Sequence, residues 1–489
     1  MILGWSEGFH DAAACVLDGP NILFASHSER FSGNKHEKFI SPELKQYIAR
    51  NYEPFCDAKV FFEKPLLKKT RQLYAGQYNT VFSKRQLAWE PTNTYHHHLS
   101  HAAAAFQTSN LDEAAAIVVD SIGEWTTTSI WKCTYNNWGR AVPKVNYEKV
   151  YNKNYPDSIG LWYTALTAYV GLRPLDEEYI FMGMAAFGEV KGPLVTALTL
   201  LLEGDAGNLH RGINKEWAIE NDLPNYKDTE IAAAAQVVLE KKLHGLFVKA
   251  KSISRNVVYG GGVALNCVAN SKLKKEVAGE FWIMPNPGDA GGALGAACLE
   301  WGSKVNWTDP YLGYDIVPSK PRRQLAKDVV KHLLKERMCG VAVGRAEYGP
   351  RALGNRSLIA DPRGDDIKDL VNTVKRRQKF RPFAPAVLKE HAHEYFHPPY
   401  GEYMQHVAYI KEEHKDSLPA ILHVDDSCRV QTVAQHEDTI FRDILELWYA
   451  KTGCPILLNT SLNIRGEPMV NDISDANRFE TKYGIKVFS

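Results

Sequence analysis

The chain has 489 residues, of which 45% are hydrophobic and 24% charged, a composition typical of a globular protein with at least two domains. The formal net charge of +1 gives no global attraction to nucleic acid or membrane surfaces, and no apolar run approaches the ~20 residues of a membrane-spanning helix. The eight cysteines are scattered without a Cys-x-x-Cys pair, and the N-terminus lacks the pattern of a secretory signal. We therefore expect free thiols in a cytoplasmic protein.

Apolar runs near the N-terminus predict short strands joined by polar turns. The turn between the first two runs carries His10 and Asp11, and the polar loop 28–36 either lines a site or is solvated. Residues 64–71 form a basic cluster, which is more typical of a solvated helix face than of a nucleic-acid patch. The apolar runs are 1–5, 12–17 and 21–26.

The histidine cluster at 96–101 predicts a metal site. His97 and His101 stand four apart before the helix-forming run 102–106, so their imidazoles lie on one face of a helix. Neutral imidazole is a favoured ligand of zinc, iron, copper and nickel. The alternative is a polar helix N-terminus with hydrogen-bonded histidines. Two carboxylates can complete the site: Asp120, which ends an apolar strand, and Asp289, in a glycine-rich loop.

Further elements follow in the order expected of an α/β protein. A triple glycine at 260–262 separates a predicted strand from a helix, so the backbone can approach an anionic ligand closely, although a structural turn is the alternative. Gly261, Gly262 and Asn266 are the candidate ligand contacts there. The predicted strands are 127–132, 144–151, 256–259, 341–344, 421–425 and 455–459, the predicted helices 159–170, 231–250 and 325–336, and residues 311–323 read as a linker.

The segment 345–381 is dense in arginine and lysine among turns and apolar residues. This pattern suggests a structured site for phosphates or carboxylates, which guanidinium groups bind in a bidentate manner. Nucleic acid is the rival ligand, disfavoured because no amphipathic basic helix is evident. The basic residues are Arg345, Arg351, Arg356, Arg363, Lys375, Arg376, Arg377, Lys379 and Arg381.

Together these stretches resemble the carbamoyltransferase family that includes the nodulation, cephamycin and tobramycin enzymes. The matching segments run in family order over nearly the whole chain. They are His97-His-Leu-Ser-His101, Val118-Val-Asp120, Ser158-Ile-Gly-Leu161, Met182-Gly-Met-Ala-Ala-Phe-Gly188, Gly261-Gly-Val-Ala-Leu-Asn266, Tyr348-Gly-Pro-Arg-Ala-Leu-Gly-Asn-Arg-Ser357, Phe380-Arg-Pro-Phe-Ala-Pro385, His423-Val-Asp425 and Asn459-Thr-Ser-Leu-Asn463.

The resemblance implies two domains of α/β class. Residues 1–315 would form a duplicated, actin-like ATPase domain similar to the threonylcarbamoyl-transferring proteins. Residues 316–489 would form an α+β domain that makes carbamoyl adenylate from carbamoyl phosphate and ATP with Mg²⁺. The carbamoyl group would then pass to an acceptor hydroxyl beside a divalent metal, iron(II) in the family.

The resemblance also implies roles for individual residues. The metal ligands would be His97, His101, Asp120 and Asp289. Arg351, Lys375, Arg381 and Arg429 would bind phosphate and carbamoyl groups, with Arg345, Arg356, Asn459, Ser461 and Asn463 as further substrate contacts. His10 and Asp11 match acceptor-side residues, and our own hypothesis is that one of them is the general base.

Departures from the family pattern leave the acceptor open. Glu178–Phe181 replaces a usual Gly-Lys, and Arg377–Phe380 departs from Arg-Glu-Pro-Phe. The chain is compact in a way that resembles phage-encoded members, for which a hydroxymethylated pyrimidine in DNA or in a nucleotide is a candidate acceptor, with residues 64–71 contacting phosphates. A sugar or other natural product is the alternative. A metal-dependent ATPase without transfer, and a threonylcarbamoyl transferase, are the competing functions.

Overall fold

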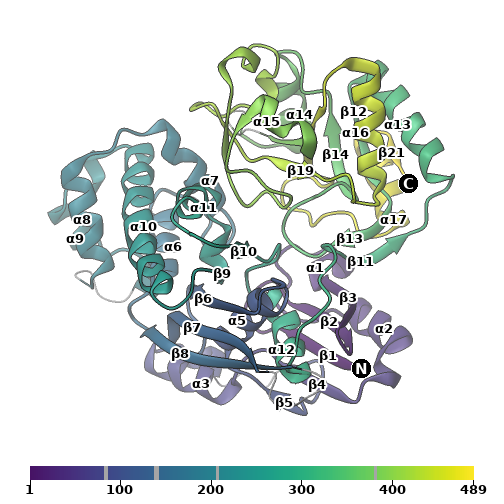
Figure 1. Ribbon diagram of the computed structural model, residues 1–489. Helices are drawn as coiled ribbons and strands as arrows, with labels where there is room; N and C mark the ends of the chain where they lie inside the picture. The colour runs from purple at the N-terminus through teal and green to yellow at the C-terminus, as the bar shows by residue number, and fades with distance from the viewer. Residues whose placement is uncertain (82–85, 137–142, 205–208, 379–380, 382) are drawn as a thin grey trace. The chain divides into compact units, whose positions relative to one another are not determined.

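A computed structural model of the protein describes residues 1–81, 86–136, 143–204, 209–378, 381 and 383–489 (Figure 1). Its contacts divide the chain into two units. Unit 1 contains Met1–Ser6, Ala14–Ile22 and Tyr52–Trp307, and unit 2 contains Glu7–Ala13, Leu23–Asn51 and Thr308–Ser489. The predicted domain boundaries, 1–315 and 316–489, stay a prediction, and so does the reaction assigned to each domain.

Two five-stranded sheets share one strand order, which agrees with the predicted duplication. The first is ordered β3-β2-β1-β4-β5 and the second β8-β7-β6-β9-β10, so the first strand of each sheet in the sequence is central. Strands β4 and β5 run parallel to β1, and strands β9 and β10 run parallel to β6. The first sheet comprises β1 (Ile2–Ser6), β2 (Ala13–Asp18), β3 (Asn21–His27), β4 (Ala58–Phe61) and β5 (Asn93–Thr94). The second comprises β6 (Glu113–Val119), β7 (Thr126–Asn136), β8 (Lys144–Asn154), β9 (Val257–Gly260) and β10 (Phe281–Ile283).

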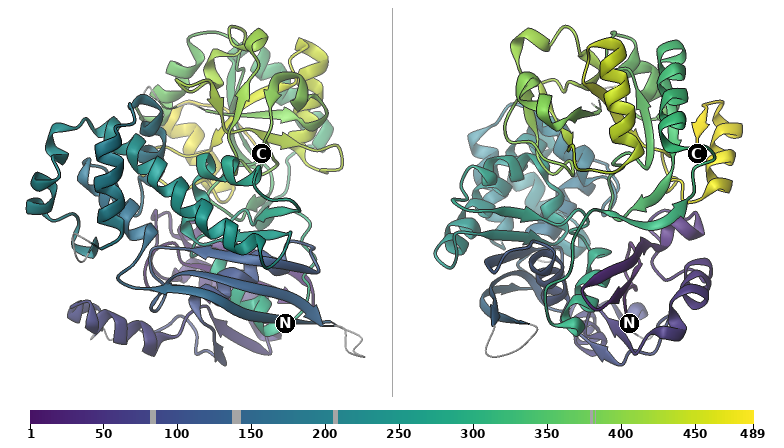
Figure 2. Two further views of the ribbon diagram at one scale, coloured as in Figure 1. Left: turned by 60° about the vertical axis from the view of Figure 1, so that its left-hand side comes forward. Right: turned by 45° about the vertical axis from the view of Figure 1, so that its right-hand side comes forward.

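Strand β6 is buried on both faces. Ala115, Ile117 and Val119 pack into the core with a helical layer, and the alternate residues pack against α5 (His97–Gln107). This alternation explains why the run 114–119 is apolar throughout. The helical layer on the outer face comprises α6 (Ile159–Tyr169), α7 (Glu178–Met184), α8 (Gly192–Leu202), α9 (Lys215–Glu220), α10 (Asp228–Lys251) and α11 (Cys267–Lys274) (Figures 1 and 2).

Helix α5 also packs closely against α12 (Gly291–Trp301). A Cβ built on Gly295 of α12 would lie 1.9 Å from the carbonyl oxygen of Ser100 in α5, so only glycine permits this contact. Helices α5 and α12 therefore form a small-residue interface in unit 1. The remaining helices of the N-terminal half are α1 (Ser28–Ser32), α2 (Pro42–Asn51), α3 (Pro65–Tyr74) and α4 (Tyr78–Val81).

Unit 2 is built on a six-stranded sheet ordered β19-β15-β20-β14-β12-β21. Helices α13 (Arg322–Glu336) and α16 (Ile440–Thr452) pack on one face, and α14 (Ile367–Lys375) and α17 (Ile473–Tyr483) pack on the other. The strands are β12 (Met338–Ala342), β14 (Arg356–Ala360), β15 (Ala384–Leu388), β19 (Gln431–Val433), β20 (Ile456–Ser461) and β21 (Val487–Phe488). Smaller elements are β11 (Tyr311–Ile316), β13 (Gly344–Glu347), β16 (Phe396–His397), β17 (Ala408–Ile410), β18 (Ser427–Cys428) and α15 (Ala392–Tyr395).

Three predicted elements differ from the structure. The predicted strand 341–344 covers the end of β12 and the start of β13. The predicted linker 311–323 contains β11, which pairs antiparallel with β13, and the start of α13. The predicted strand 421–425 does not form: Ile421 ends a 3-10 helix (Pro419–Ile421), and a turn follows. In this turn the Asp425 carboxylate accepts hydrogen bonds from both the backbone N–H and the hydroxyl of Ser427, and these local hydrogen bonds compete with strand pairing.

Candidate functional site

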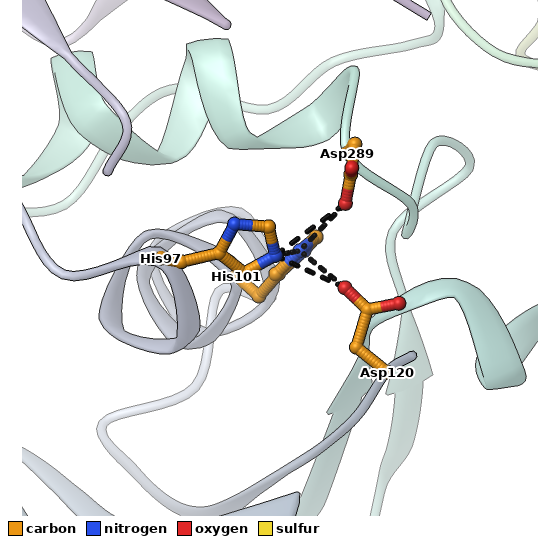
Figure 3. Close-up of side chains that lie close together, drawn as sticks. All are labelled: His97, His101, Asp120 and Asp289. Atoms are coloured by element: carbon orange, nitrogen blue, oxygen red, sulfur yellow. Dashed lines mark hydrogen bonds and ion pairs between the residues drawn. The ribbon is translucent and has the colours of Figure 1, made fainter. Parts of the chain in front are cut away.

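Four side chains from three separate segments meet at one point in unit 1. His97 and His101 lie one turn apart on α5, Asp120 follows β6, and Asp289 precedes α12 (Figure 3). All four residues are at least nine-tenths buried. One donor atom from each lies within 4.8 Å of the other three, which brings the predicted metal ligands together.

The distances in this cluster fit a metal ion. The Nε2 atom of His97 lies 3.0 Å from both Asp120 Oδ2 and His101 Nε2, and 3.4 Å from Asp289 Oδ1. His101 Nε2 lies 3.4 Å from Asp120 Oδ2 and 3.5 Å from Asp289 Oδ1. Ligand atoms at the usual metal distance of about 2.1 Å stand roughly 3.0–3.4 Å apart in octahedral or tetrahedral geometry. The site can therefore hold a divalent ion with little rearrangement.

The charges in the cluster favour an ion pair when no metal is bound. Burial alone favours neutral imidazole, but the carboxylates of Asp289 and Asp120 outweigh it and raise the pKa of His97 and of His101. The imidazoles in turn hold the pKa of Asp120 well below its usual range, despite burial. His98, although adjacent, is held outside the cluster by a 2.9 Å hydrogen bond to Ser129 Oγ.

Two residues of the triple glycine contact the end of β6 that carries Asp120. Gly261 has φ +88°, and a Cβ there would lie 2.2 Å from the carbonyl oxygen of Val119, so the position requires glycine. Gly262 donates its backbone N–H to Asp120 Oδ1 at 3.3 Å. Ser121 N–H donates to the same oxygen at 2.8 Å. With Oδ1 so engaged, Oδ2 faces the histidines. The predicted nucleotide contact by Gly261 and Gly262 stays a prediction.

Asn266 has structural partners in this conformation. Its side chain caps α11 by accepting the N–H of Ala269, and it exchanges two hydrogen bonds with the amide of Gln236. The predicted ligand role of Asn266 would require these bonds to be given up, and it stays a prediction.

Two acidic residues near the metal cluster were missed by sequence reasoning. Glu63 is buried, pairs with Lys68 Nζ at 2.6 Å and reaches to 3.8 Å from His97 Nδ1. Glu124 is buried and accepts the backbone N–H groups of His97 and Lys64. The one available signal for Glu63 was its position just after a buried parallel strand, where ligand-binding residues gather.

A second polar cluster, in unit 2, contains the predicted acceptor-side residues. The Asp11 carboxylate lies 3.0 Å from His10 Nδ1 and 2.9 Å from His36 Nδ1. These two hydrogen bonds outweigh burial and lower the pKa of Asp11. Asp11 and His36 both have positive φ angles, 51° and 55°, which is uncommon outside glycine and concentrates at functional sites. His36 was named within a polar loop, but its contact with Asp11 was not foreseen.

The predicted Lys375, which is buried, forms one hydrogen-bonded group with the half-buried Ser461 and Asn463. Lys375 Nζ donates to the backbone oxygen of Ser461 at 2.6 Å and to Asn463 Oδ1 at 2.7 Å. Burial and the positive charges of Arg377, Arg381 and Lys35 lower the pKa of Lys375 well below its usual value. Among the residues that the structure describes, no carboxylate pairs with Lys375, so the group is suited to an anion.

The predicted arginines divide into two kinds. Arg356 is fully buried, and its guanidinium donates to the backbone carbonyls of Tyr314, Val343, Gly344, Asn355 and Asn471. Arg345 likewise donates to the carbonyls of Leu23 and Leu312. Arg351, Arg381 and Arg429 are half-buried. Lys379, Phe380 and Pro382, which belong to the same predicted region, lie outside the described residues.

The loop that carries Arg351 is held from two sides. Glu347 Oε1 accepts the backbone N–H groups of Leu353, Asn355 and Arg356, and the predicted Asn459 donates to the carbonyl of Ala352 at 3.1 Å. Asn459 thus positions the residue next to Arg351. A loop fixed in this way can present a guanidinium in one orientation.

Unit 1 also contains a pocket of about 360 Å³ that is lined by aromatic, polar and leucine side chains. Tyr74 and Tyr155 line it, with ring centroids 6.2 Å apart, together with Asp157 and Ser158. Ser158 Oγ donates to the carbonyl of Ser121, next to the predicted ligand Asp120. The pocket wall is therefore connected to the segment that carries the metal cluster.

Comparison with known proteins identifies the family. Residues 42–298 match the Carbamoyltransferase N-terminus and residues 330–489 the Carbamoyltransferase C-terminus. The protein sll1178 of Synechocystis is 33% identical over 98% of this chain and 93% of its own length. The nodulation protein NolNO of Sinorhizobium fredii is 27% identical over 96% of this chain and 76% of its own length.

Among solved structures, the activator of 2-hydroxyisocaproyl-CoA dehydratase from Clostridium difficile aligns with 61% of this chain and 94% of its own, at 16% identity and a TM-score of 0.37. No helix in the described part of the chain is long and apolar enough to span a membrane. All eight cysteines are free, as expected. On the two family matches, which cover most of the sequence, the chain belongs to the carbamoyltransferase family of enzymes.

Proposed function

We propose that this enzyme is an ATP-dependent O-carbamoyltransferase that uses carbamoyl phosphate. The observation that carries the proposal is the buried Lys375, whose amino group donates to neutral oxygen atoms among positively charged residues. Burial and these neighbours lower the pKa of Lys375, and the negative charge of a bound anion would offset them and favour the charged amine. Carbamoyl phosphate and the triphosphate of ATP supply that charge, and Arg351, Arg381 and Arg429 would share it.

The proposed reaction has two steps, of which the first combines two reactions. Water hydrolyses carbamoyl phosphate to carbamate and phosphate; a carbamate oxygen then attacks the α-phosphorus of ATP, and the bond to pyrophosphate breaks, which gives carbamoyl adenylate. In the second step the acceptor hydroxyl attacks the carbamoyl carbon, the bond to the AMP oxygen breaks, and the hydroxyl proton passes to a base. We assign that base to His10, because Asp11 at its Nδ1 favours the tautomer that leaves Nε2 basic.

The metal cluster supports the transfer step. His97, His101, Asp120 and Asp289 would hold the ion, and a mixed nitrogen and oxygen donor set suits iron(II) among other divalent metals. When bound, the ion supplies Lewis-acid polarisation of a carbonyl or phosphate oxygen. The close contact of Gly295 in α12 with Ser100 in α5 would hold the histidines and Asp289 at a fixed spacing around the ion.

For the acceptor we favour a small-molecule hydroxyl, such as that of a sugar, over hydroxymethylated DNA. Three of the basic residues expected to contact phosphates have protein partners: Lys64 bonds to Thr94, Lys68 to Glu63, and Arg71 to the carbonyl of Glu124. The aromatic pocket beside Ser158 suits a neutral ring with hydroxyl groups, and Asp157 at its wall disfavours a phosphate.

The first test is pyrophosphate release from ATP, with and without carbamoyl phosphate, in anaerobic buffer with iron(II). We expect release that depends on carbamoyl phosphate and is lost in Arg351→Ala. If no release occurs without acceptor, the assay is repeated with an acceptor mixture; absence of release in both would refute the proposal. Acceptors are then screened by the mass gain of a carbamoyl group, with sugars compared against hydroxymethylated DNA.

The proposed base has a separate test. His10→Gln should abolish carbamoyl transfer, because the acceptor proton has no recipient, while carbamoyl-phosphate-dependent pyrophosphate release continues. Asp11→Asn should reduce transfer by a smaller factor, because it disturbs only the orientation of His10. Loss of both half-reactions in a folded His10→Gln protein would count against this assignment.

A further inference from the structure

His97 carries a buried ring nitrogen that the metal cluster does not use. Its Nε2 atom faces Asp120, His101 and Asp289, whereas its Nδ1 atom is buried without a hydrogen-bond partner. Glu63 Oε2 lies 3.8 Å from this Nδ1. A buried imidazole nitrogen facing a buried carboxylate at this distance requires an explanation, because unsatisfied buried donors are costly.

Coordination by Nε2 dictates where the proton of His97 lies. A neutral imidazole that binds a metal through Nε2 carries its hydrogen on Nδ1, and that N–H needs an acceptor. Among the described residues, Glu63 is the one whose carboxylate lies within 4.0 Å of Nδ1. A shift of about 1 Å would bring the pair to hydrogen-bond distance.

We propose that Glu63 and Lys68 form an outer-sphere positioning pair for the metal centre: Glu63 accepts the Nδ1 proton of His97 and so fixes the ring for coordination, and Lys68 holds Glu63 in place. The inference rests on the proposed metal-binding role of the four-residue cluster. The Lys68 Nζ atom lies 2.6 Å from Glu63 Oε1, leaving Oε2 directed at the imidazole.

The segment that carries Glu63 is fastened to helix α5. The carbonyl of Phe62 accepts a 2.9 Å hydrogen bond from Ser100 Oγ, and the Phe62 ring lies 5.1 Å from that of His97. On the other side, the N–H of Lys64 donates to Glu124, which also accepts the backbone N–H of His97. Glu63 is therefore held between two attachments to the element that carries the ligand.

The charges of the pair suit an orienting role. Asp120 and Asp289 already balance the two charges of a divalent ion, and Lys68 balances Glu63, so the pair adds no net charge. Its effect on the metal is transmitted through the ring of His97, by raising the basicity of Nε2 and removing alternative ring orientations. Glu124 provides a matched comparison, because it is equally buried but its hydrogen bond to His97 is to the backbone N–H of that residue.

The test measures metal affinity instead of turnover. Dissociation constants for iron(II), under anaerobic conditions, and for zinc(II) are determined by chelator competition for the full-length wild type and for Glu63→Gln, Glu63→Ala and Glu124→Gln. We expect Glu63→Ala to weaken binding by ~10- to 100-fold and Glu63→Gln by less, since Gln retains an oxygen acceptor. Glu124→Gln should lower the melting temperature with less than about a threefold effect on affinity, because it caps the helix and does not touch the ring.

The outcomes separate this inference from the proposed function. If the wild type binds no stoichiometric metal, the metal-binding role itself fails, and the positioning pair fails with it. If the wild type binds metal and Glu63→Ala binds it equally well, only the positioning pair is refuted. Equal weakening by Glu63→Gln and Glu124→Gln would also refute it, because the effect would then be a general property of the buried acidic surroundings. Cobalt(II) absorption bands that shift in Glu63→Gln but not in Glu124→Gln would support it.

Discussion

The carboxylates of Asp120 and Asp289 set the charge state of the two imidazoles beside them. Without a metal, they raise the pKa of His97 and of His101, so each imidazole keeps its second ring proton at pH values where a free histidine has lost it. A metal must displace those protons before both Nε2 atoms can coordinate. Metal binding is therefore coupled to proton release at this site.

This coupling predicts a steep pH dependence of metal affinity. Because the raised pKa values extend protonation above the ordinary histidine range, affinity should fall as pH decreases from 8 to 6, by ~10-fold per pH unit for each proton displaced. Chelator competition with zinc(II) at several pH values measures the slope. Asp289→Asn removes one ligand and one cause of the raised pKa of His97, and should bind metal weakly with a shallower slope. A pH-independent affinity in the wild type would contradict the cluster as the metal site.

Site residues that a local sequence pattern marks were easier to predict than residues whose role depends on partners far away in the sequence. The spacing of His97 and His101 on one helix face foretold their convergence, and Asp120 could be placed at a strand end. Glu63 escaped notice because its link to His97 spans more than thirty positions and has no spacing signature. Arg356 resembled its neighbouring arginines in sequence, and only the fold shows that backbone carbonyls surround its guanidinium.

At the scale of elements, the site depends on how closely α5 and α12 approach. The Gly295 contact leaves no space for a methyl group, since a Cβ there would lie 2.6 Å from the carbonyl carbon of Ser100. Ser100 lies between the two ligand histidines on α5, and Asp289 precedes α12. A change in the spacing of these helices therefore changes the spacing of the metal ligands.

We expect Gly295→Ala to destabilise the protein by ~3 kcal/mol through overpacking and to weaken metal binding. Gly245→Ala is the matched control, because Gly245 lies within α10 and is exposed, and outside the adjoining backbone of its own helix no described atom lies within 4 Å of the point that an added methyl group would occupy. It should stabilise the protein by about 1 kcal/mol, since alanine is the better helix former. Thermal unfolding followed by circular dichroism measures both. Similar melting temperatures for the two variants would refute the tight α5–α12 contact.

Elements with strong periodic patterns were well predicted, whereas those governed by local polar contacts were not. The helix expected at 231–250 is α10, and the strand expected at 455–459 is β20. The turn at 421–425 and the strand β11 within the predicted linker depended on interactions that the pattern does not contain: the hydrogen bonds of Asp425 and the pairing of β11 with β13.

At the scale of the whole molecule, the two candidate sites belong to different units. The metal cluster lies entirely in unit 1, and the Lys375 group lies entirely in unit 2. The proposed chemistry assigns adenylation to the Lys375 group and carbamoyl transfer to the metal cluster. If each of these two sites serves one half-reaction, single substitutions in them should separate the two activities.

We therefore predict that substitutions in the Lys375 group and in the metal cluster affect different half-reactions. Lys375→Met should lower carbamoyl-phosphate-dependent pyrophosphate release by ~10²- to 10³-fold, because a preorganised cation at the anion site is lost, while metal stoichiometry stays that of the wild type. Lys368→Met is the matched control on the same helix, since Lys368 contacts the carbonyl of Leu422 and not the Ser461–Asn463 group. Asp289→Asn should show the reverse, with metal binding and carbamoyl transfer lost and pyrophosphate release retained. If Asp289→Asn, still folded, also loses pyrophosphate release, adenylation itself requires the metal cluster, and the assignment of one half-reaction to each site is wrong.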